Sequence, residues 1–389
     1  MALVDSTLIV LAAVLFFGLV VPELFKKFQL PFATSLIIVG SLFGPNGLNY
    51  LQTNDSLELF GFLGAAFLML LSGLEARSDR FENLKKAIFS MSIINSLIPF
   101  VVGFSIVLLF GYSLQAALLI GVIFISSSAA LVFSTIKTLK LGNHKIGQIV
   151  SSVVIVEDII SLFLLTVLIQ SANSSRFPLI IYLGLLVSSV MILRMFLPEL
   201  TTYYFKKHKK HDEYETHLRI VIALLLVVLI IYSGMGVNPI VASFLVGLIL
   251  AKVPKFEIIK KKLHTIGYGI FVPIFFFIVG MQTDFKLIMT LDLTNYLMIS
   301  IILGLFFSKF ISGYMSAKSQ GFKSKEAVFF GSISTSKLTT ALSATFAAFS
   351  VGIIDSTLLS SIVMMSVIST IVGPALTIFL FKKQGEIND

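Results

Sequence analysis

Two adjacent carboxylates, Glu157 and Asp158, lie in the middle of an apolar stretch that runs from Gly147 to Gln170. A charged side chain at the centre of a membrane-spanning helix costs at least ~2.5–3.5 kcal/mol, so such groups are rare unless they are paired or functional. Adjacent helical residues point about 100° apart, and the two carboxylates therefore cannot face the same partner. We expect one to pair with a buried lysine and the other to face a water-filled cavity, where it binds either a proton or a small cation.

Two lysines in other apolar stretches, Lys309 and Lys337, are candidates for the buried positive charge. Lys337 is expected near the middle of its span and Lys309 somewhat off-centre, whereas Arg194 is close enough to a span end to reach the membrane interface. A purely structural network of buried charges is the alternative interpretation, although it gives no reason for two carboxylates on different helix faces.

Competition between a proton and a cation for one carboxylate leads to exchange. Moving the empty, negatively charged site across an apolar barrier is penalised, whereas the protonated or cation-loaded site crosses at lower cost. These residues therefore predict an obligatory antiporter.

The composition indicates that these residues lie in a membrane protein. The 389 residues are 57% hydrophobic and only 13% charged, with a mean hydropathy of +0.99. Soluble domains carry roughly a quarter charged residues, so we predict a polytopic membrane protein, all-α because strands cross a membrane only as closed barrels. The absence of cysteine excludes disulfides and thiolate metal sites.

Thirteen helical spans are expected, near residues 6–24, 32–49, 57–75, 87–110, 114–136, 147–170, 177–198, 217–234, 239–252, 265–282, 293–316, 325–349 and 357–381.

The distribution of basic residues predicts the orientation. Most of the 29 Lys and Arg residues lie in the loops after odd-numbered spans and in the C-terminal tail, whereas the loops after even-numbered spans hold only Arg176 and Lys286. Basic residues accumulate in cytoplasmic loops, which predicts an external N-terminus and a cytoplasmic C-terminus in the cell membrane. The run from Lys206 to Lys210 is then a topogenic loop, with a lipid-headgroup or regulatory site as the alternative, and no nucleic-acid partner is expected. The five histidines lie at the cytoplasmic span ends, as solvated residues or as pH sensors: His144, His208, His211, His217 and His264.

An odd number of spans suggests two inverted repeats of six within one membrane domain, at about 1–171 and 217–383, with a linker span at about 177–198. Span five and span twelve share a feature that supports this division, because both carry a cluster of hydroxyl residues near mid-span. Such clusters can satisfy backbone groups that a helix break frees, although small residues also serve ordinary helix packing. The predicted breaks involve Ser126, Ser127 and Ser128 in the first repeat and Ser334, Thr335 and Ser336 in the second.

Two other classes of protein were weighed. A passive or gated monovalent cation channel could use the same repeats, but fixed positive charge beside the path disfavours cations. An intramembrane enzyme is not supported, because the spans contain no Ser-His pair and no His/Cys spacing typical of a metal site.

The chain resembles the bacterial monovalent cation/proton antiporters, the sodium/proton and potassium/proton exchangers of the cation:proton antiporter superfamily. The segment from Ser126 to Ala130 is similar to the Ser-Ser-Thr-Ala segment of the unwound helix, with Ser128 replacing Thr. Further matching segments are Leu30-Pro31, Gly40 to Pro45, Glu58 to Gly61, Leu71 to Glu75, Phe244 to Gly247 and Pro273 to Met281.

The resemblance implies that Asp158 carries the cation (Na⁺, Li⁺ or K⁺) and the proton, with Ser127 and Ser128 beside it, and that Lys309 pairs with Glu157. It also implies a homodimer in membrane lipid, a scaffold of spans one to three and eight to ten, and a mobile core of spans four to six and eleven to thirteen. No cofactor and no soluble C-terminal domain are expected. Two departures leave the stoichiometry and the partner of Glu157 open. The electrogenic branch has Asp at the position of Glu157, and many relatives carry a Gly-Glu motif where this chain has Thr335-Ser336-Lys337.

Overall fold

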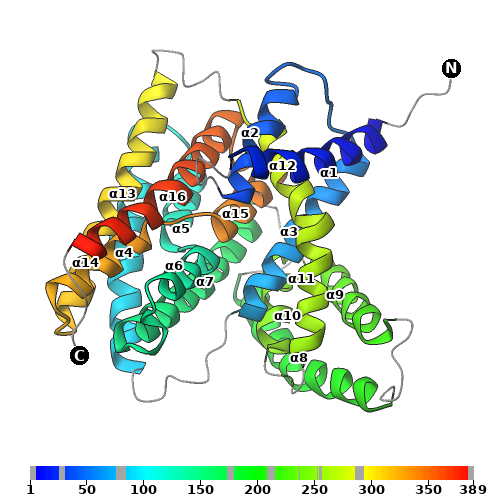
Figure 1. Cartoon of the computed structure of the whole chain (residues 1–389). Helices are drawn as coiled ribbons and strands as arrows, with labels where there is room; N and C mark the ends of the chain where they lie inside the picture. Colours follow the sequence, from blue (N-terminus) through cyan, green and yellow to red (C-terminus); the bar gives the residue numbers. More distant parts are fainter. Residues whose placement is uncertain are drawn as a thin grey trace. The chain divides into compact units, whose positions relative to one another are not determined.

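The computed structural model describes residues 6–25, 31–75, 85–172, 179–207, 215–235, 237–251, 253, 256–284 and 293–383. The regular elements in these ranges are all helices (Figure 1). Several residues on which the predicted orientation rests lie outside the described ranges: Lys26, Lys27, Arg77, Arg80, Arg176, His208, Lys209, Lys210, His211, Lys252, Lys255 and Lys286.

The described helices correspond to the thirteen expected spans, so the all-α prediction is confirmed. Ten spans are long and apolar enough to cross a membrane, counting α5 with α6 and α11 with α12, while α2 and α10 are shorter apolar helices and α14 with α15 forms the remaining span. The bounds are α1 Ser6–Phe25, α2 Phe32–Phe43, α3 Asp55–Glu75, α4 Lys85–Leu109, α5 Leu114–Ile125, α6 Ala129–Thr138, η3 Leu141–Asn143, α7 Lys145–Ala172, α8 Leu179–Lys207, α9 Thr216–Gly234, α10 Pro239–Leu250, α11 Glu257–Ile266, η4 Gly267–Phe271, α12 Val272–Gln282, α13 Leu293–Ser319, α14 Ser324–Ser334, α15 Thr339–Ser350 and α16 Ser356–Lys383.

The linker span differs from its prediction at its C-terminal end. Helix α8 passes through Pro198 and continues to Lys207, whereas the sequence suggested an end near residue 198. A proline removes one helical hydrogen bond but does not prevent the helix from continuing when the flanking residues favour it. Arg194 therefore lies near the middle of α8.

Both breaks are present, and the second is displaced from its predicted position. Ser126 to Ser128 separate α5 from α6, with extended backbone at Ser126 (φ −63°, ψ 155°). In the second repeat Ser334 is the last residue of α14, and the break runs from Thr335 to Leu338. The hydroxyl of Ser334 donates to the carbonyl of Phe330 at 2.7 Å. The break therefore includes Lys337.

The chain divides into two compact units. One comprises residues 1–54, 78–165 and 276–389, and the other comprises residues 55–77 and 166–275. This division differs from the scaffold that the resemblance implies, because α1, α2 and the end of α12 group with the broken helices. The reason is close packing within the first unit: a Cβ at Gly40 would overlap the backbone carbonyl of Phe277, and a Cβ at Gly280 would overlap that of Ile37. In addition, the hydroxyls of Thr34 and Thr370 are hydrogen-bonded at 2.8 Å.

The second unit is held together by the packing of α3 against α10. A Cβ at Gly73 would overlap the carbonyl of Phe244, so the two backbones are in direct contact. The rings of Phe67 and Phe271 stack with centroids 4.5 Å apart in the same unit. Small residues at such contacts are typical of helix packing in membranes, where close backbone approach replaces the hydrophobic effect.

Candidate ion-binding site

The site forms in the first unit, where the two breaks meet. The backbone N–H of Ser128 donates to the carbonyl of Ser336 at 2.8 Å, and the hydroxyl of Ser127 lies 3.1 Å from the carbonyl of Ser334. Backbone groups that a helix break frees must find partners where water is scarce. Each break supplies hydrogen-bonding groups to the other, so the two non-helical segments lie directly against each other.

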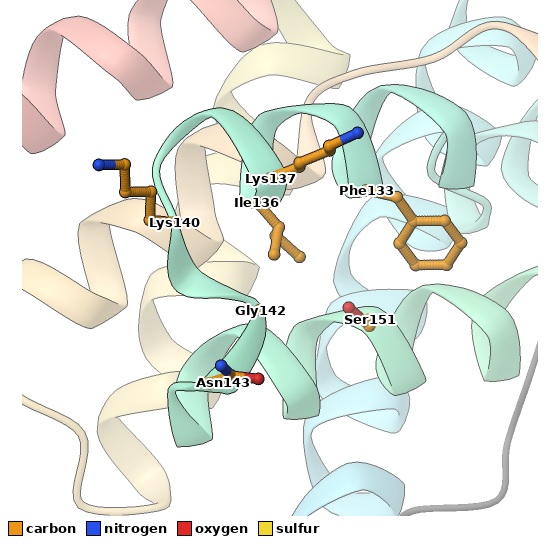
Figure 2. Close-up of a pocket in the computed structure, with 7 residues that line it drawn as sticks. All are labelled: Phe133, Ile136, Lys137, Lys140, Gly142, Asn143 and Ser151. Carbon is orange, nitrogen blue, oxygen red and sulfur yellow. The ribbon is translucent and has the colours of Figure 1, made fainter.

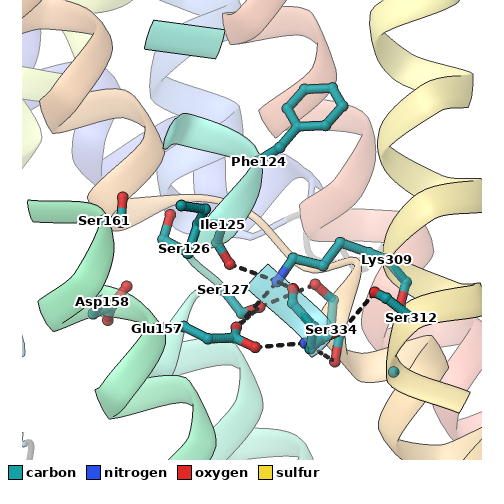
Figure 3. Close-up of polar contacts among 12 residues, drawn as sticks. Phe124, Ile125, Ser126, Ser127, Glu157, Asp158, Ser161, Lys309, Ser312 and Ser334 are labelled. Atoms are coloured by element: carbon teal, nitrogen blue, oxygen red, sulfur yellow. Dashed lines mark hydrogen bonds and ion pairs between the residues drawn. The ribbon is translucent and has the colours of Figure 1, made fainter. Parts of the chain in front are cut away.

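Glu157, on α7, is completely buried and has three polar neighbours (Figure 3). Its Oε1 accepts from Asn95 Nδ2 at 2.6 Å, and its Oε2 lies 3.0 Å from the hydroxyl of Ser127 and 3.1 Å from Lys309 Nζ. A buried carboxylate is tolerated when it is both paired and hydrogen-bonded, and Glu157 meets both conditions.

Lys309 reaches Glu157 from α13. Besides the carboxylate, its ammonium donates to the carbonyl of Asn95 at 2.9 Å and to the carbonyl of Ile125 at 2.5 Å. An ammonium has three donors, and all three are used here. The sequence left open which lysine pairs with Glu157, and in the structure it is Lys309.

Asp158 faces a different side of α7 from Glu157, as Figure 3 shows. It is 1% exposed, and its Oδ1 accepts a hydrogen bond of 3.0 Å from the hydroxyl of Thr340 on α15. The different directions of adjacent residues follow from helix geometry. The two carboxylates therefore have different surroundings, one beside an ammonium and one beside a neutral hydroxyl.

Lys337 is buried in the second break and bonds backbone carbonyls. Its ammonium donates to Phe124 at 2.9 Å and to Ile123 at 3.3 Å. Its own N–H and C=O each bond the hydroxyl of Ser369 on α16, both at 3.0 Å. Lys337 and Lys309 thus lie at the same end of α5 but have different partners.

The hydroxyls predicted from the sequence have different neighbours. Ser127 is next to Glu157, not Asp158, while Ser126 and Thr335 bond carbonyls of their own helix ends, Ile123 at 3.4 Å and Ser332 at 2.7 Å. The buried hydroxyls of Ser128 and Ser336 have no hydrogen-bond partner within the described residues.

Sequence reasoning missed four residues of this network: Asn95, Ser312, Thr340 and Ser369. Asn95 donates to Glu157 and accepts from Ser312 at 2.7 Å, which fixes the amide on α4. A lone amide inside an otherwise apolar span was a usable signal, because a polar group at that depth needs a partner. Thr340 lies at the end of the hydroxyl cluster of span twelve, but the cluster did not indicate its contact with Asp158. Ser312 and Ser369 are single hydroxyls and gave no signal, since Ser and Thr are common at helix contacts.

A pocket of about 470 Å³ lies beside α6, η3 and the start of α7 (Figure 2). It is lined by Phe133, Ile136, Lys137, Lys140, Gly142, Asn143 and Ser151. Ser151 precedes Asp158 by two helical turns, about 10 Å, on the same face of α7. The ammonium groups of Lys137 and Lys140 point in opposite directions in Figure 2, so they do not converge on one anion.

The described residues contain no group of three or more His, Asp or Glu side chains that could hold a resident metal ion. The polar groups described at the site are the two carboxylates, the two ammonium groups and the surrounding hydroxyl, amide and carbonyl groups.

Comparison with known proteins places the chain in a family. Residues 11–383 match the family described as "Sodium/hydrogen exchanger, transmembrane". The chain is 32% identical to "Probable Na(+)/H(+) antiporter 3" of Methanocaldococcus jannaschii, over 93% of both chains. It is 26% identical to "Na(+)/H(+) antiporter NhaS5" of Synechocystis sp., over 96% of this chain but only 54% of that relative, so it spans about half of the relative's length.

Among solved structures, the fold is similar to that of the sodium proton antiporter MjNhaP1 from Methanocaldococcus jannaschii. The TM-score is 0.75 and the alignment covers 97% of this chain and 98% of that chain, at 17% sequence identity. The helical fold is thus shared by two distantly similar sequences. With the family match over nearly its whole length, the chain belongs to the sodium/hydrogen exchanger family of multi-pass membrane proteins and is a secondary-active antiporter, not a passive channel.

Proposed function

We propose that Asp158 binds the transported cation and the proton in turn. Glu157 and Lys309 form a fixed ion pair that maintains the geometry of the site. The observation that carries this proposal is the difference between the two carboxylates. Glu157 is held by an amide, a hydroxyl and an ammonium, whereas Asp158 accepts a hydrogen bond from the neutral hydroxyl of Thr340. A carboxylate without an ammonium partner keeps its negative charge available for a cation.

We assign oxygen ligands to an alkali cation at Asp158. Hard cations prefer oxygen ligands, and the hydroxyls of Ser128 and Thr339 are buried without hydrogen-bond partners in the described chain. Together with Thr340 they are the proposed neutral ligands beside the carboxylate. The names of the relatives favour Na⁺ as the transported cation, and Li⁺ and K⁺ are the alternatives that carry the same charge.

Exchange follows from the charge of this site in its three states. Lys309 compensates Glu157, whereas Lys337 bonds the carbonyls of α5, so the carboxylate of Asp158 itself is negative when empty and neutral when it holds one proton or one cation. Only the neutral states pass the apolar barrier at low cost, so each crossing in one direction is coupled to a return crossing with the other ion. No covalent chemistry is involved.

The pocket at Ser151 is the proposed cytoplasmic mouth of the path to Asp158. It lies at the lysine-rich end of α6 and α7, and the excess of basic residues at this end supports a cytoplasmic location. We further propose that the protein lies in the cell membrane with its N-terminus outside, and that it acts as a homodimer, as the family resemblance implies.

The experiment uses everted membrane vesicles from cells that lack other antiporters, with a pH-sensitive dye inside. After a proton gradient is established, Na⁺, Li⁺ and K⁺ are added in turn to the wild type and to Asp158→Asn. Recovery of the dye signal in the wild type and its loss in Asp158→Asn support the proposal. Full exchange by Asp158→Asn at equal protein level would overturn it.

A matched control is Asp55→Asn, because Asp55 is an exposed carboxylate in the first turn of α3. Exchange by this variant is expected to equal that of the wild type. Cation flux that continues without any proton movement would contradict coupled exchange.

A further inference from the structure

Both buried lysines bind the same helix end, the C-terminus of α5. The carbonyl of Ile125 accepts from Lys309, and those of Phe124 and Ile123 accept from Lys337 at 2.9 and 3.3 Å. The last carbonyls of a helix lack intrahelical partners and carry the negative end of its dipole. At α5, three consecutive carbonyls of this kind are thus bonded to ammonium groups.

The equivalent end of α14 in the second repeat is bonded to hydroxyls and to a backbone N–H. The carbonyl of Ser332 accepts from the hydroxyl of Thr335 at 2.7 Å, and that of Ser334 lies 3.1 Å from the hydroxyl of Ser127. The carbonyl of Ile333, between them, accepts from the backbone N–H of Ser336 at 3.1 Å. In the described structure, no ammonium bonds these carbonyls. The two repeats are alike in backbone but unequal in charge.

The backbone of Lys337 is held in place by Ser369 on α16. Ser369 bonds both the N–H and the C=O of Lys337. One turn later on α16, a Cβ at Gly373 would overlap the hydroxyl of Ser336, so α16 lies directly against the break. With its peptide bonded on both sides and its side chain completely buried, Lys337 has little freedom to turn elsewhere.

We propose that Lys337 is a specificity-determining residue that closes the carbonyl end of α5 to the transported cation. Carbonyls freed at a broken helix are common ligands for transported alkali cations. Here a covalently attached ammonium holds two of them, and its charge repels a second cation. The transported ion is thereby confined to the oxygens around Asp158 and Thr340. This proposal rests on the proposed role of Asp158 as the carrier.

The test compares Lys337→Met, Lys337→Gln and Lys337→Arg in the full chain. Met keeps most of the length of the stem but removes charge and donors, Gln removes the charge and keeps an amide donor, and Arg keeps both charge and donors. Two quantities are measured at alkaline pH: the apparent KM for Na⁺ and K⁺ in vesicles, and the cation concentration that gives half of the maximal thermal stabilisation of the purified protein.

We expect the apparent KM and the half-stabilising concentration to fall at least tenfold in Lys337→Met and at least threefold in Lys337→Gln. Lys337→Arg should remain within threefold of the wild type. If Lys337→Met does not fold, the Gln variant decides, because its amide can still bond the carbonyls of α5.

Unchanged cation affinity in a folded neutral variant, or the same change in Arg as in Met, would overturn the proposal. Asp158→Asn is combined with Lys337→Gln as a separate arm. If cations stabilise this double variant as strongly as the wild type, the carrier role of Asp158 is contradicted. If only the expected affinity changes of the Lys337 variants are not found, that role remains intact.

Discussion

The hydrogen bond from the N–H of Ser128 to the carbonyl of Ser336 joins the breaks of the two repeats. Each break exposes backbone groups that would be costly in a membrane without partners. Because the two breaks bond each other, neither is a local defect that its own repeat could stabilise. The site at Glu157 and Asp158 thus depends on residues from both halves of the chain.

The pair of Glu157 and Lys309 predicts a large loss of stability when one partner is removed. Lys309→Ala leaves a completely buried carboxylate without its counter-charge, which costs about 3–5 kcal/mol. The free energy of unfolding in detergent is to be measured for this variant and for the double variant Glu157→Gln with Lys309→Met, in which part of the loss should be recovered.

An exposed ion pair provides the control for that measurement. Lys262 and Glu215 are paired, and their side chains are 32% and 51% exposed. Lys262→Ala should cost less than ~1 kcal/mol. Equal losses in Lys309→Ala and Lys262→Ala would contradict the importance assigned to the buried pair.

Asn95 predicts a second effect on stability and on exchange. Asn95→Leu removes the donor to Glu157 Oε1 and the acceptor for Ser312, at a cost of about 1–3 kcal/mol for each polar group left without a partner. The control is Ser92→Ala, one turn earlier on α4, whose buried hydroxyl makes no hydrogen bond within the described residues. Thermal unfolding and vesicle exchange are to be compared, and a Ser92→Ala defect as large as that of Asn95→Leu would count against this interpretation.

The close approach of α2 and α12 predicts that even one methyl group is harmful there. Gly40→Ala places a Cβ against the backbone carbonyl of Phe277, which cannot move as a side chain can, and overpacking of this kind costs about 1–3 kcal/mol. Gly184→Ala on α8 is the matched control, because no atom lies within 4 Å of its Cβ position. It should stabilise the protein by about 0.5–1 kcal/mol through helix propensity. A midpoint of thermal unfolding that rises in both variants would be inconsistent with the described contact.

The pocket beside α6 predicts where a reagent can block the path. The chain has no cysteine, so Ser151→Cys introduces a single thiol. A membrane-impermeant thiosulfonate should inhibit exchange in everted vesicles, where the cytoplasmic face is outward, because the added group fills the pocket two turns from Asp158.

Two further single-cysteine variants control for access and position. Thr138→Cys is exposed on α6 but does not line the pocket, so it should react without loss of exchange. Gln115→Cys, exposed at the opposite end of the first broken helix, should react only in right-side-out vesicles. Labelling of Ser151→Cys from the external face would reverse the proposed orientation.

The spans and the two breaks could be predicted from the sequence, because helix length, apolar runs and hydroxyl clusters are local properties. The partners of the buried lysines could not. Whether Lys309 or Lys337 reaches Glu157 depends on how α13 and the second break are rotated about their axes, which residue spacing alone does not determine. The contacts of Thr340 and Ser369 could not be predicted for the same reason. The end of α8 at Lys207 lies beyond the expected end of the linker span near residue 198.

The unequal ends of α5 and α14 also bear on kinetics. Two identical inverted repeats would make the inward-open and outward-open states equivalent, and the cation would then show the same half-saturating concentration on either side. Two ammonium groups at one helix end and none at its described counterpart remove that equivalence. The direction of net exchange is still set by the ion gradients alone, but the antiporter is expected to work as an asymmetric carrier, saturating at different cation concentrations on its two faces.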